Sequence, residues 1–187
     1  VRVLKPKIQN IDLGEYEYIP RLSWSGSQNK LILQTLNRHQ NQLKYHLVDL
    51  SGKKMTQKMF FEEKSTTYVE IDNNLMIRKD GNSILRTSEI DGFNHIYQLD
   101  FSGTSTQITK GNWDVIDLYG IDESTNTVYY SSAEVSPMIK TINSISTNGS
   151  NKSLLSLPIG VSDAEFTAGM KFMVLTHSDA NTPPVYT

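Results

Sequence analysis

Hydrophobic and polar positions form short blocks, in which apolar clusters are interrupted every four to eight residues by Gly, Asn, Asp, Ser or Pro. The clusters are rich in β-branched and aromatic residues and lack a helical period, so the pattern predicts strands and almost no helix. The predicted strands are Ile19–Trp24, Lys30–Leu36, Leu43–Leu50, Met55–Phe61, Leu75–Lys79, Ile84–Ser88, Phe93–Asp100, Val115–Ile121, Thr127–Ser132, Thr141–Ser146 and Lys171–Thr176.

Two kinds of turn recur in alternation between these strands. The first series is marked by Gly26, Gly81, Asn126 and Gly169, which are 55, 45 and 43 residues apart. The second series is marked by Gly52, Gly103 and Gly149, which are 51 and 46 residues apart. A repeat of about 40 to 50 residues holding four short strands is typical of a β-propeller blade. A β-sandwich also uses many short strands but lacks this fixed register of paired turns, so the repeat favours the propeller.

We therefore predict an all-β fold, a partial β-propeller of about three and a half four-stranded blades, with residues 1–187 forming a single fragment. The predicted blades lie near residues 15–62, 68–110 and 114–157, with a half-blade at 162–187. Propellers usually close with about four to eight blades, so two copies complete one another or further blades lie on other sequence. Charged residues near the start and the lack of an initiator Met lead us to expect a chain cut from a longer one.

Composition narrows the function classes. Hydrophobic residues make up 37% of the 187 residues, which is enough for a packed core. The 18 Lys and Arg against 20 Asp and Glu give a net charge of −2, which disfavours a nucleic-acid reader. No cysteine is present, which excludes disulfides and thiolate chemistry. No apolar run approaches the roughly 18 to 20 residues that span a bilayer, so we expect no membrane span.

Motifs for catalysis are missing from the sequence. It contains no Gly-x-Ser-x-Gly elbow, Walker loop or dinucleotide-binding fingerprint. The four histidines, His39, His46, His95 and His177, occupy different repeats or turns without metal-binding spacing, so structural or surface roles are expected. We therefore assign no catalytic, cofactor-binding or metal-binding residue and expect no cofactor.

Three further groups have a functional and a structural interpretation. Glu62 and Glu63 could clamp a cation only in a turn or helix, because strand neighbours point to opposite faces; we interpret them as a solvated loop after an outer strand. The aromatic residues beside turns are Trp24, Trp113, Tyr119, Tyr129 and Tyr130. We expect them to pack between blades, with ligand stacking as the alternative. Asn148 and Asn151 fit the glycosylation acceptor pattern, which turn chemistry explains equally well.

Several stretches resemble the propeller of the dipeptidyl peptidase IV family, in family order. They are Leu36–Asn41, Asp91–Tyr97, Ile108–Val115, Val128–Pro137 and Ser178–Pro184. The resemblance implies a serine-type parent enzyme in which an eight-bladed propeller precedes an α/β-hydrolase domain with a Ser-Asp-His triad. Such enzymes remove N-terminal dipeptides that carry Pro or Ala second. The chain resembles the later half of that propeller, so the catalytic α/β-hydrolase domain is expected to be absent from it.

The resemblance further implies that the segment is inactive alone and that it gates and positions peptide substrates for its own hydrolase domain. The resemblance leaves the oligomeric state of the parent open, with a homodimer as one alternative, and nucleic acid is not expected as a partner. The lack of cysteine resembles bacterial members, which implies export to the periplasm of a Gram-negative bacterium. The alternative is a free-standing propeller that serves as an interaction module of a bacterial surface or periplasmic protein.

Neither of two family features carries over to residues of this chain. The family's substrate-binding glutamates lie on a helix that precedes Val1 in family order, so Glu62 and Glu63 do not match them. Tyr68–Asn74 is equivalent to a loop that projects aromatic and arginine side chains in some members, but it lacks their Arg-Phe-Arg pattern. No functional residue is therefore transferred.

Overall fold

The computed structural model describes residues 8–25, 29–71 and 73–187, and within these ranges it contains strands, turns and loops but no helix. The strands are β1 (Leu22–Trp24), β2 (Lys30–Leu36), β3 (Gln42–Asp49), β4 (Thr56–Lys64), β5 (Met76–Ile77), β6 (Ser83–Ser88), β7 (His95–Asp100), β8 (Ser105–Gln107), β9 (Val115–Asp122), β10 (Thr127–Ser136), β11 (Ile139–Ser146), β12 (Ser153–Leu154), β13 (Val161–Phe166), β14 (Met173–Ser178) and β15 (Val185–Tyr186). The all-β prediction is confirmed.

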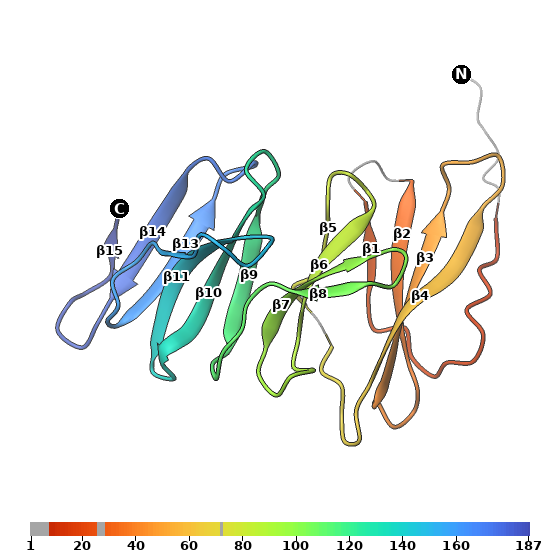
Figure 1. The fold of residues 1–187 in the computed structure, drawn as a ribbon, viewed down its shortest axis with the longest axis horizontal. Coiled ribbons are helices and arrows are strands. Elements are labelled where there is room, and N and C mark those ends of the chain that lie inside the picture. The colour runs from red at the N-terminus through yellow and green to blue at the C-terminus, as the bar shows by residue number, and fades with distance from the viewer. Residues whose placement is uncertain (1–7, 26–28, 72) are drawn as a thin grey trace.

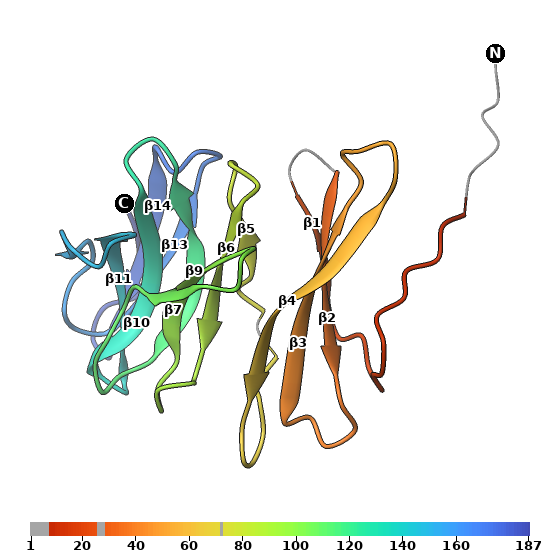
Figure 2. The same ribbon diagram turned by 45° about the vertical axis from the view of Figure 1, so that its right-hand side comes forward.

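The strands form antiparallel sheets in chain order. The first sheet is β1-β2-β3-β4 and the second is β5-β6-β7-β8. In the third sheet, β10 pairs with β9 and β11, and β12 adds a short edge to β11. The strands β13-β14-β15 continue this sheet to seven strands through a parallel pairing of β13 with β11, and we call these three strands the fourth sheet. Figures 1 and 2 show the sheets following one another along the molecule, from orange through green to blue, as successive blades would.

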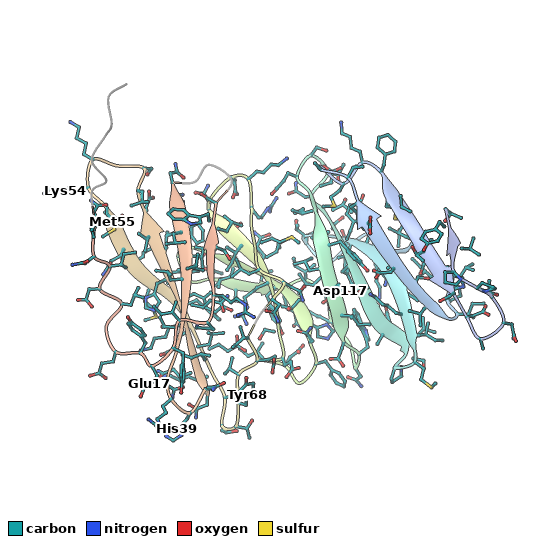
Figure 3. The ribbon with its side chains drawn as sticks, turned by 180° about the vertical axis from the view of Figure 1, so that it is seen from behind. Glu17, His39, Lys54, Met55, Tyr68 and Asp117 are labelled. Atoms are coloured by element: carbon teal, nitrogen blue, oxygen red, sulfur yellow. The ribbon has the colours of Figure 1, made fainter. Side chains whose placement is uncertain are left out.

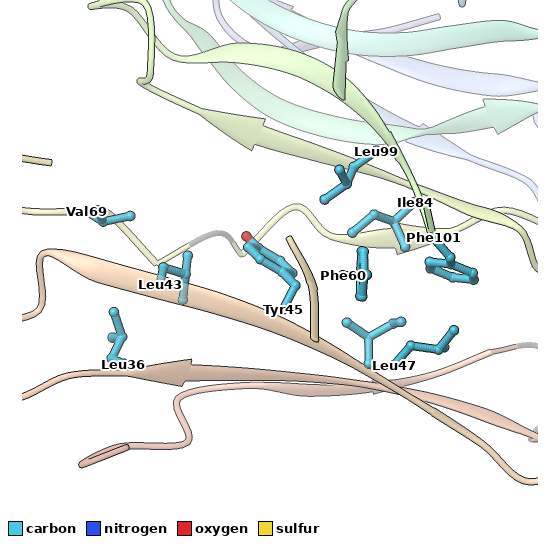
Figure 4. Packing of buried hydrophobic residues seen from close by; sticks show 10 residues of the cluster. Leu36, Leu43, Tyr45, Leu47, Phe60, Val69, Ile84, Leu99 and Phe101 are labelled. Atoms are coloured by element: carbon cyan, nitrogen blue, oxygen red, sulfur yellow. The ribbon is translucent and has the colours of Figure 1, made fainter. Parts of the chain in front are cut away.

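The first and second sheets pack face to face through a continuous apolar core. Tyr45 and Leu47 of β3 and Phe60 of β4 meet Ile84 of β6 and Leu99 of β7, all at most 8% exposed (Figure 4). The opposite face of the first sheet is covered by residues 11–13 of the N-terminal segment, which pack on Leu31, Leu33 and Val48. Because both of its faces are covered, β2 is buried from Leu31 to Leu36 without alternation, although Gln34 and Thr35 are polar.

A second core joins the second and third sheets. Leu85 and Ile96 from the second sheet pack against Leu118, Val128 and Tyr130 from the third. Both cores have large apolar side chains on facing sheets. The spacing of the sequence repeat therefore corresponds to one sheet of the stack.

The fourth sheet meets the third in two ways. Phe166 of β13 packs on Tyr119 and Tyr129, with ring centroids 5.4 and 5.0 Å apart. In addition, β13 pairs in parallel with β11 at Lys140 and Val161, where the Lys140 amide donates to the Gly160 carbonyl at 3.3 Å. The third strand of the third sheet thus touches the next sheet through its backbone.

The repeated turns share one hydrogen-bond pattern. Asp49, Asp100 and Asn148 each accept bonds from the backbone amide and hydroxyl of the serine two residues later. In the first marker series, Gly81, Asn126 and Gly169 have φ of 64°, 55° and 83°, the left-handed conformation that favours Gly and Asn. The remaining marker, Gly26, lies outside the described residues.

Four strands escaped the sequence prediction. They are β8, β12, β13 and β15. Three of them have only two or three residues, and β13 buries the small side chains Ser162 and Ala164 rather than large apolar ones. Several predicted strands also end one or more residues from the observed bounds, whereas Lys30–Leu36 is reproduced in full.

Candidate functional site

One end of the stack gathers the β2–β3 turn, the β4–β5 connection and the β6–β7 turn. We call it the Tyr68 end, after a half-exposed residue of the β4–β5 connection. In Figure 3, Tyr68 lies at the same end as His39 of the β2–β3 turn, and opposite to Lys54 of the β3–β4 turn. The Val69 amide donates to the Gln40 carbonyl at 2.9 Å, which fastens the β4–β5 connection to the β2–β3 turn.

Two adjoining cavities open at the Tyr68 end, between the β4–β5 connection and the second sheet. Their volumes are about 240 and 150 Å³, and Glu70 and Glu89 line both of them. We call this pair of cavities the Glu70–Glu89 cleft. The β4–β5 connection forms one wall and the β6–β7 turn forms the other. Asp72, which belongs to the loop singled out from the sequence, lies outside the described residues.

Glu63 is a buried acid beneath the cleft, so its interpretation as part of a solvated loop was wrong. It is the penultimate residue of β4, only 7% exposed, and one carboxylate oxygen pairs with the Arg86 guanidinium. The other oxygen accepts the Ser88 hydroxyl at 2.7 Å. Arg86 also lies over the ring of Tyr45, 4.9 Å from its centre. The pair neutralises a charge that would be costly to bury alone.

Glu62 points to the other face of β4, as expected for strand neighbours. It forms an ion pair with Lys64 at 2.9 Å and accepts a hydrogen bond from Gln42. The hydrogen bond from Lys64 outweighs partial burial and lowers the pKa of the Glu62 carboxyl. The two glutamates therefore do not converge on one ligand.

The histidines stay apart and serve the fold. His95 is fully buried and bonds the Thr109 hydroxyl and the Gly111 carbonyl at 3.0 and 2.9 Å. His46 is buried at 2.9 Å from the Thr35 hydroxyl, and burial together with nearby Lys44 lowers its pKa. His177 contacts the Ser162 hydroxyl at 3.0 Å, and His39 is exposed in its turn. No group of three or more His, Asp and Glu suited to a metal ion occurs within the described ranges.

The predicted inter-blade aromatic residues are largely in place. Trp113 and Tyr130 belong to the core between the second and third sheets, and Tyr119 and Tyr129 contact Phe166 of the fourth. Trp24 differs, because half of its side chain is exposed on the short strand β1. Asn148 acts as a turn cap, as the turn interpretation of the glycosylation pattern expects.

Polar contacts lock the second sheet to the third at the end opposite the Tyr68 end. The Arg78 guanidinium, placed just after β5, donates to one Glu123 carboxylate oxygen at 2.6 and 3.1 Å. The Lys79 amide donates to the other oxygen at 2.9 Å. Although burial opposes it, the Arg78 hydrogen bond holds the pKa of the Glu123 carboxyl below its usual range. We call this contact the Arg78–Glu123 latch.

Sequence analysis missed the latch, the buried Glu63–Arg86 pair and the acids of the Glu70–Glu89 cleft. An opposite charge one repeat away is a detectable signal, since Arg78 and Glu123 are 45 residues apart. Sequence offers no comparable signal for the cleft, because the folded path of residues 65–71 beside the β6–β7 turn determines it. Within the described residues, no helix is long and apolar enough to cross a membrane.

Comparison with known proteins identifies the family to which the chain belongs. The model for the dipeptidyl peptidase IV N-terminal region matches residues 2–184. The crystal structure of Porphyromonas gingivalis dipeptidyl peptidase 4 is 36% identical and superposes with a TM-score of 0.80, covering 90% of this chain and 24% of that one. Its similarity confirms the partial β-propeller.

Curated relatives point the same way. A probable dipeptidyl-aminopeptidase B of Phaeosphaeria nodorum is 26% identical over 186 residues, which cover 88% of this chain and 20% of the relative. The inactive dipeptidyl peptidase 10 of Mus musculus is 29% identical over 143 residues, which cover 71% of this chain and 18% of the relative. The chain thus spans about a fifth of the curated relatives it matches. It belongs to the dipeptidyl peptidase IV N-terminal region family, and its successive sheets are blades of a β-propeller.

Proposed function

We propose that this chain is the propeller segment of a serine-type dipeptidyl peptidase that releases N-terminal X-Pro and X-Ala dipeptides. The family match over residues 2–184 carries the proposal, supported by the 36% identity to a dipeptidyl peptidase of known structure. The reaction itself belongs to a hydrolase domain outside the chain. Export to the periplasm is part of the same proposal, and cell fractionation would test it.

In this proposal the segment gates and positions the peptide. The two apolar cores and the Arg78–Glu123 latch hold neighbouring blades in fixed relation. The Tyr68 end carries the connections between sheets and would face the space through which a peptide reaches the nucleophile. A fixed wall favours slender chains and keeps the substrate in register, which supports selectivity for length.

Activity measurements on two proteins test the assignment. The purified 187-residue chain should not hydrolyse a Gly-Pro chromogenic substrate above the buffer rate, whereas the longer protein that contains it should release Gly-Pro. Hydrolysis by the 187-residue chain would contradict the assignment of catalysis to a separate hydrolase domain. Absence of turnover by the longer protein, with its folding verified, would overturn the peptidase assignment.

Gating needs a second readout, the ratio of cleavage rates for long and short substrates. In the longer protein, Arg78→Ala should loosen the latch between the second and third blades and raise cleavage of long X-Pro peptides relative to Gly-Pro-p-nitroanilide. Lys171→Ala, which changes an exposed turn lysine, is the matched control. An unchanged ratio in Arg78→Ala, with measurably weaker coupling between the blades, would contradict gating.

A protein-interaction propeller is the second candidate. The observation that favours it is the similarity to a relative whose name states that it is inactive. A longer protein that folds, lacks peptidase activity and retains a specific protein partner would support this candidate over the first.

A further inference from the structure

A cavity of about 280 Å³ lies between the second and third sheets and shares no residue with the Glu70–Glu89 cleft. One wall comes from the segment after β8, which includes Lys110 and Trp113. The other comes from β10, β11 and the turn before β12, with Tyr130, Ile145 and Lys152. We call this cavity the Trp113 pocket. Its volume is near the lower end of the range for small-molecule sites, about 300 to 1,000 Å³.

Aromatic rings that are already held in place form the body of the pocket. Trp113 and Tyr130 lie nearly parallel, with an interplanar angle of 11° and centroids 6.3 Å apart. His95 meets the Trp113 ring edge to face at 4.9 Å, and its own two hydrogen bonds fix its orientation. A flat apolar group could therefore stack here without first ordering the wall.

Tyr130 adds an unused polar group. Its side chain is fully buried, and its hydroxyl has no hydrogen-bond partner among the described residues. A buried hydroxyl without a partner is costly, and a ligand oxygen that accepted its proton would remove that cost. The unpaired Tyr130 hydroxyl therefore favours a ligand with a hydrogen-bond acceptor at this position over a purely apolar ligand.

The two charged residues that line the pocket are both lysines, and one of them is paired with an acid outside the lining. Lys110 is exposed and forms no ion pair with any residue that the structure describes. The Lys152 ammonium lies 4.9 Å from the centre of the Trp113 ring and contacts the Glu134 carboxylate. Among the residues that the structure describes, no acidic side chain lines the cavity itself. The lining thus favours an anionic group at the mouth.

We propose that the Trp113 pocket binds a small aromatic carboxylate, with its ring against Trp113 and its carboxylate shared by the Tyr130 hydroxyl and the two lysines. Each part of the ligand corresponds to one feature of the pocket. The ring would stack on the Trp113 side chain, and a carboxylate oxygen would accept a hydrogen bond from the Tyr130 hydroxyl. The negative charge would be attracted to Lys110 and Lys152. The site is independent of peptide cleavage, so it stands or falls separately from the proposed peptidase role.

Fluorescence of a single tryptophan offers a direct test. The chain has two tryptophans, so Trp24→Phe leaves Trp113 as the only reporter. The probes are benzoate, benzamide, which has the ring without the charge, and acetate, which has the charge without the ring. Benzoate should cause a saturable change, benzamide should bind at least about fivefold more weakly, and acetate should give none.

Variants in the Trp24→Phe background separate the contributions of the two lysines and the Tyr130 hydroxyl to benzoate binding. Lys110→Gln and Lys152→Gln should each weaken benzoate binding about fivefold while leaving benzamide binding unchanged. Tyr130→Phe should weaken benzoate binding by a similar factor without lowering the melting temperature, because it removes only an unpaired hydroxyl. Lys171→Gln, an exposed lysine far along the chain in the β13–β14 turn, serves as the charge-matched control.

Three results would overturn the proposal. One is the absence of saturation with benzoate in the folded Trp24→Phe chain. Another is equal affinity for benzoate and benzamide, which would remove the role of charge. The third is a loss of benzoate affinity in Lys171→Gln as large as in Lys110→Gln, since this would indicate only general attraction of anions to a less negative protein.

Discussion

The carbonyl oxygen of Phe60 lies 2.6 Å from the position that a Cβ atom would occupy on Gly103. Phe60 belongs to β4 of the first sheet, and Gly103 belongs to the β7–β8 turn of the second. The next repeat has a related contact, in which the Ile108 carbonyl lies 3.2 Å from the corresponding position on Gly149. These glycines thus permit backbone contact between neighbouring blades, in addition to their turn conformation.

Two glycine-to-alanine substitutions can separate the effect of the contact between blades from the effect of the left-handed backbone conformation on stability. Gly103 and Gly92 have almost the same φ, 100° and 101°, but nothing lies within 4 Å of a Cβ on Gly92. Gly92→Ala should therefore cost about 1 kcal/mol of unfolding free energy from backbone strain alone. Gly103→Ala should cost about 1 to 3 kcal/mol more, because the blades must separate. Urea unfolding would measure both, and equal losses would contradict a role for the Phe60 contact.

Breaking the buried pair of Glu63 and Arg86 should be far more harmful than replacing it. Glu63→Gln leaves the Arg86 charge buried without its partner, so we expect a loss of about 3 kcal/mol or more. The double variant Glu63→Leu, Arg86→Met should recover most of this loss because no charge remains to be compensated. Chemical denaturation of the three proteins is the measurement. A double variant as unstable as Glu63→Gln would show that the pair contributes specific geometry instead.

The Arg78–Glu123 latch should show measurable coupling between blades. The two side chains are only 11% and 18% exposed, so a double-mutant cycle with Arg78→Ala and Glu123→Ala should give about 1 to 2 kcal/mol. The pair of Arg38 and Glu17 is the matched control, since it is 80% and 51% exposed with 3.9 Å between the charged atoms. Its coupling should be near zero and disappear in 1 M salt. Similar values for both pairs would contradict the latch.

The capping acids of the turns should make stability fall in acid. Hydrogen bonds from the Ser102 hydroxyl and the Thr104 amide lower the pKa of the Asp100 carboxyl from its ordinary value. Because the folded pKa is depressed, the stabilisation is fully present above about pH 5 and is lost as the pH falls through the folded value. Asp100→Asn should remove this part of the acid sensitivity. Asn148 already makes the equivalent bonds, so the turn should survive the change.

Thermal melts between pH 2 and 7 would check this sign. The curves for Asp100→Asn and the parent chain should converge as the pH falls and lie closest where Asp100 is protonated. A variant that loses the same stability as the parent at every step from pH 5 to pH 2 would show that folding does not lower the pKa of Asp100.

The fourth sheet should promote self-association of the chain. Phe172, Val174 and Tyr186 are 75%, 51% and 70% exposed on or beside its strands. Apolar side chains gathered on a sheet are a common cause of association. Val174→Lys should lower the apparent mass in light scattering at high protein concentration while leaving the circular dichroism unchanged. A monomeric parent chain at the same concentration would contradict this expectation.

Sequence predicted the strands that carry large side chains and the turns that need special backbone angles. The strand Lys30–Leu36 could be predicted because both faces of β2 are covered. The turns at Gly81 and Asn126 could be predicted because a left-handed backbone conformation restricts the choice of residue. The strand β13 was not, since Ser162 and Ala164 fill its buried face. Glu63 misled the interpretation because a buried acid becomes plausible only once its distant partner, Arg86, is known.

The cleft and the pocket were beyond sequence reasoning for a related reason. Trp113 and Tyr130 were recognised as aromatic residues near turns, but their parallel stacking and the unpaired hydroxyl depend on how two sheets approach. Glu70 and Glu89 are 19 residues apart and share a cleft only because a connection folds back beside a turn.

The parallel bridge between Lys140 and Val161 gives the blades unequal freedom to slide. The first and second sheets meet mainly through side chains, whereas the second and third are also joined by the Arg78–Glu123 latch and by the Val115 amide, which donates to the Asn94 carbonyl at 2.7 Å. Between the third and fourth sheets, the main-chain hydrogen bond of the parallel bridge acts together with the ion pairs of Lys140 with Asp117 and Asp163. These contacts restrict sliding of the two sheets past one another. Relative motion of neighbouring blades should therefore concentrate between the first and second sheets, at the contact filled by Phe60.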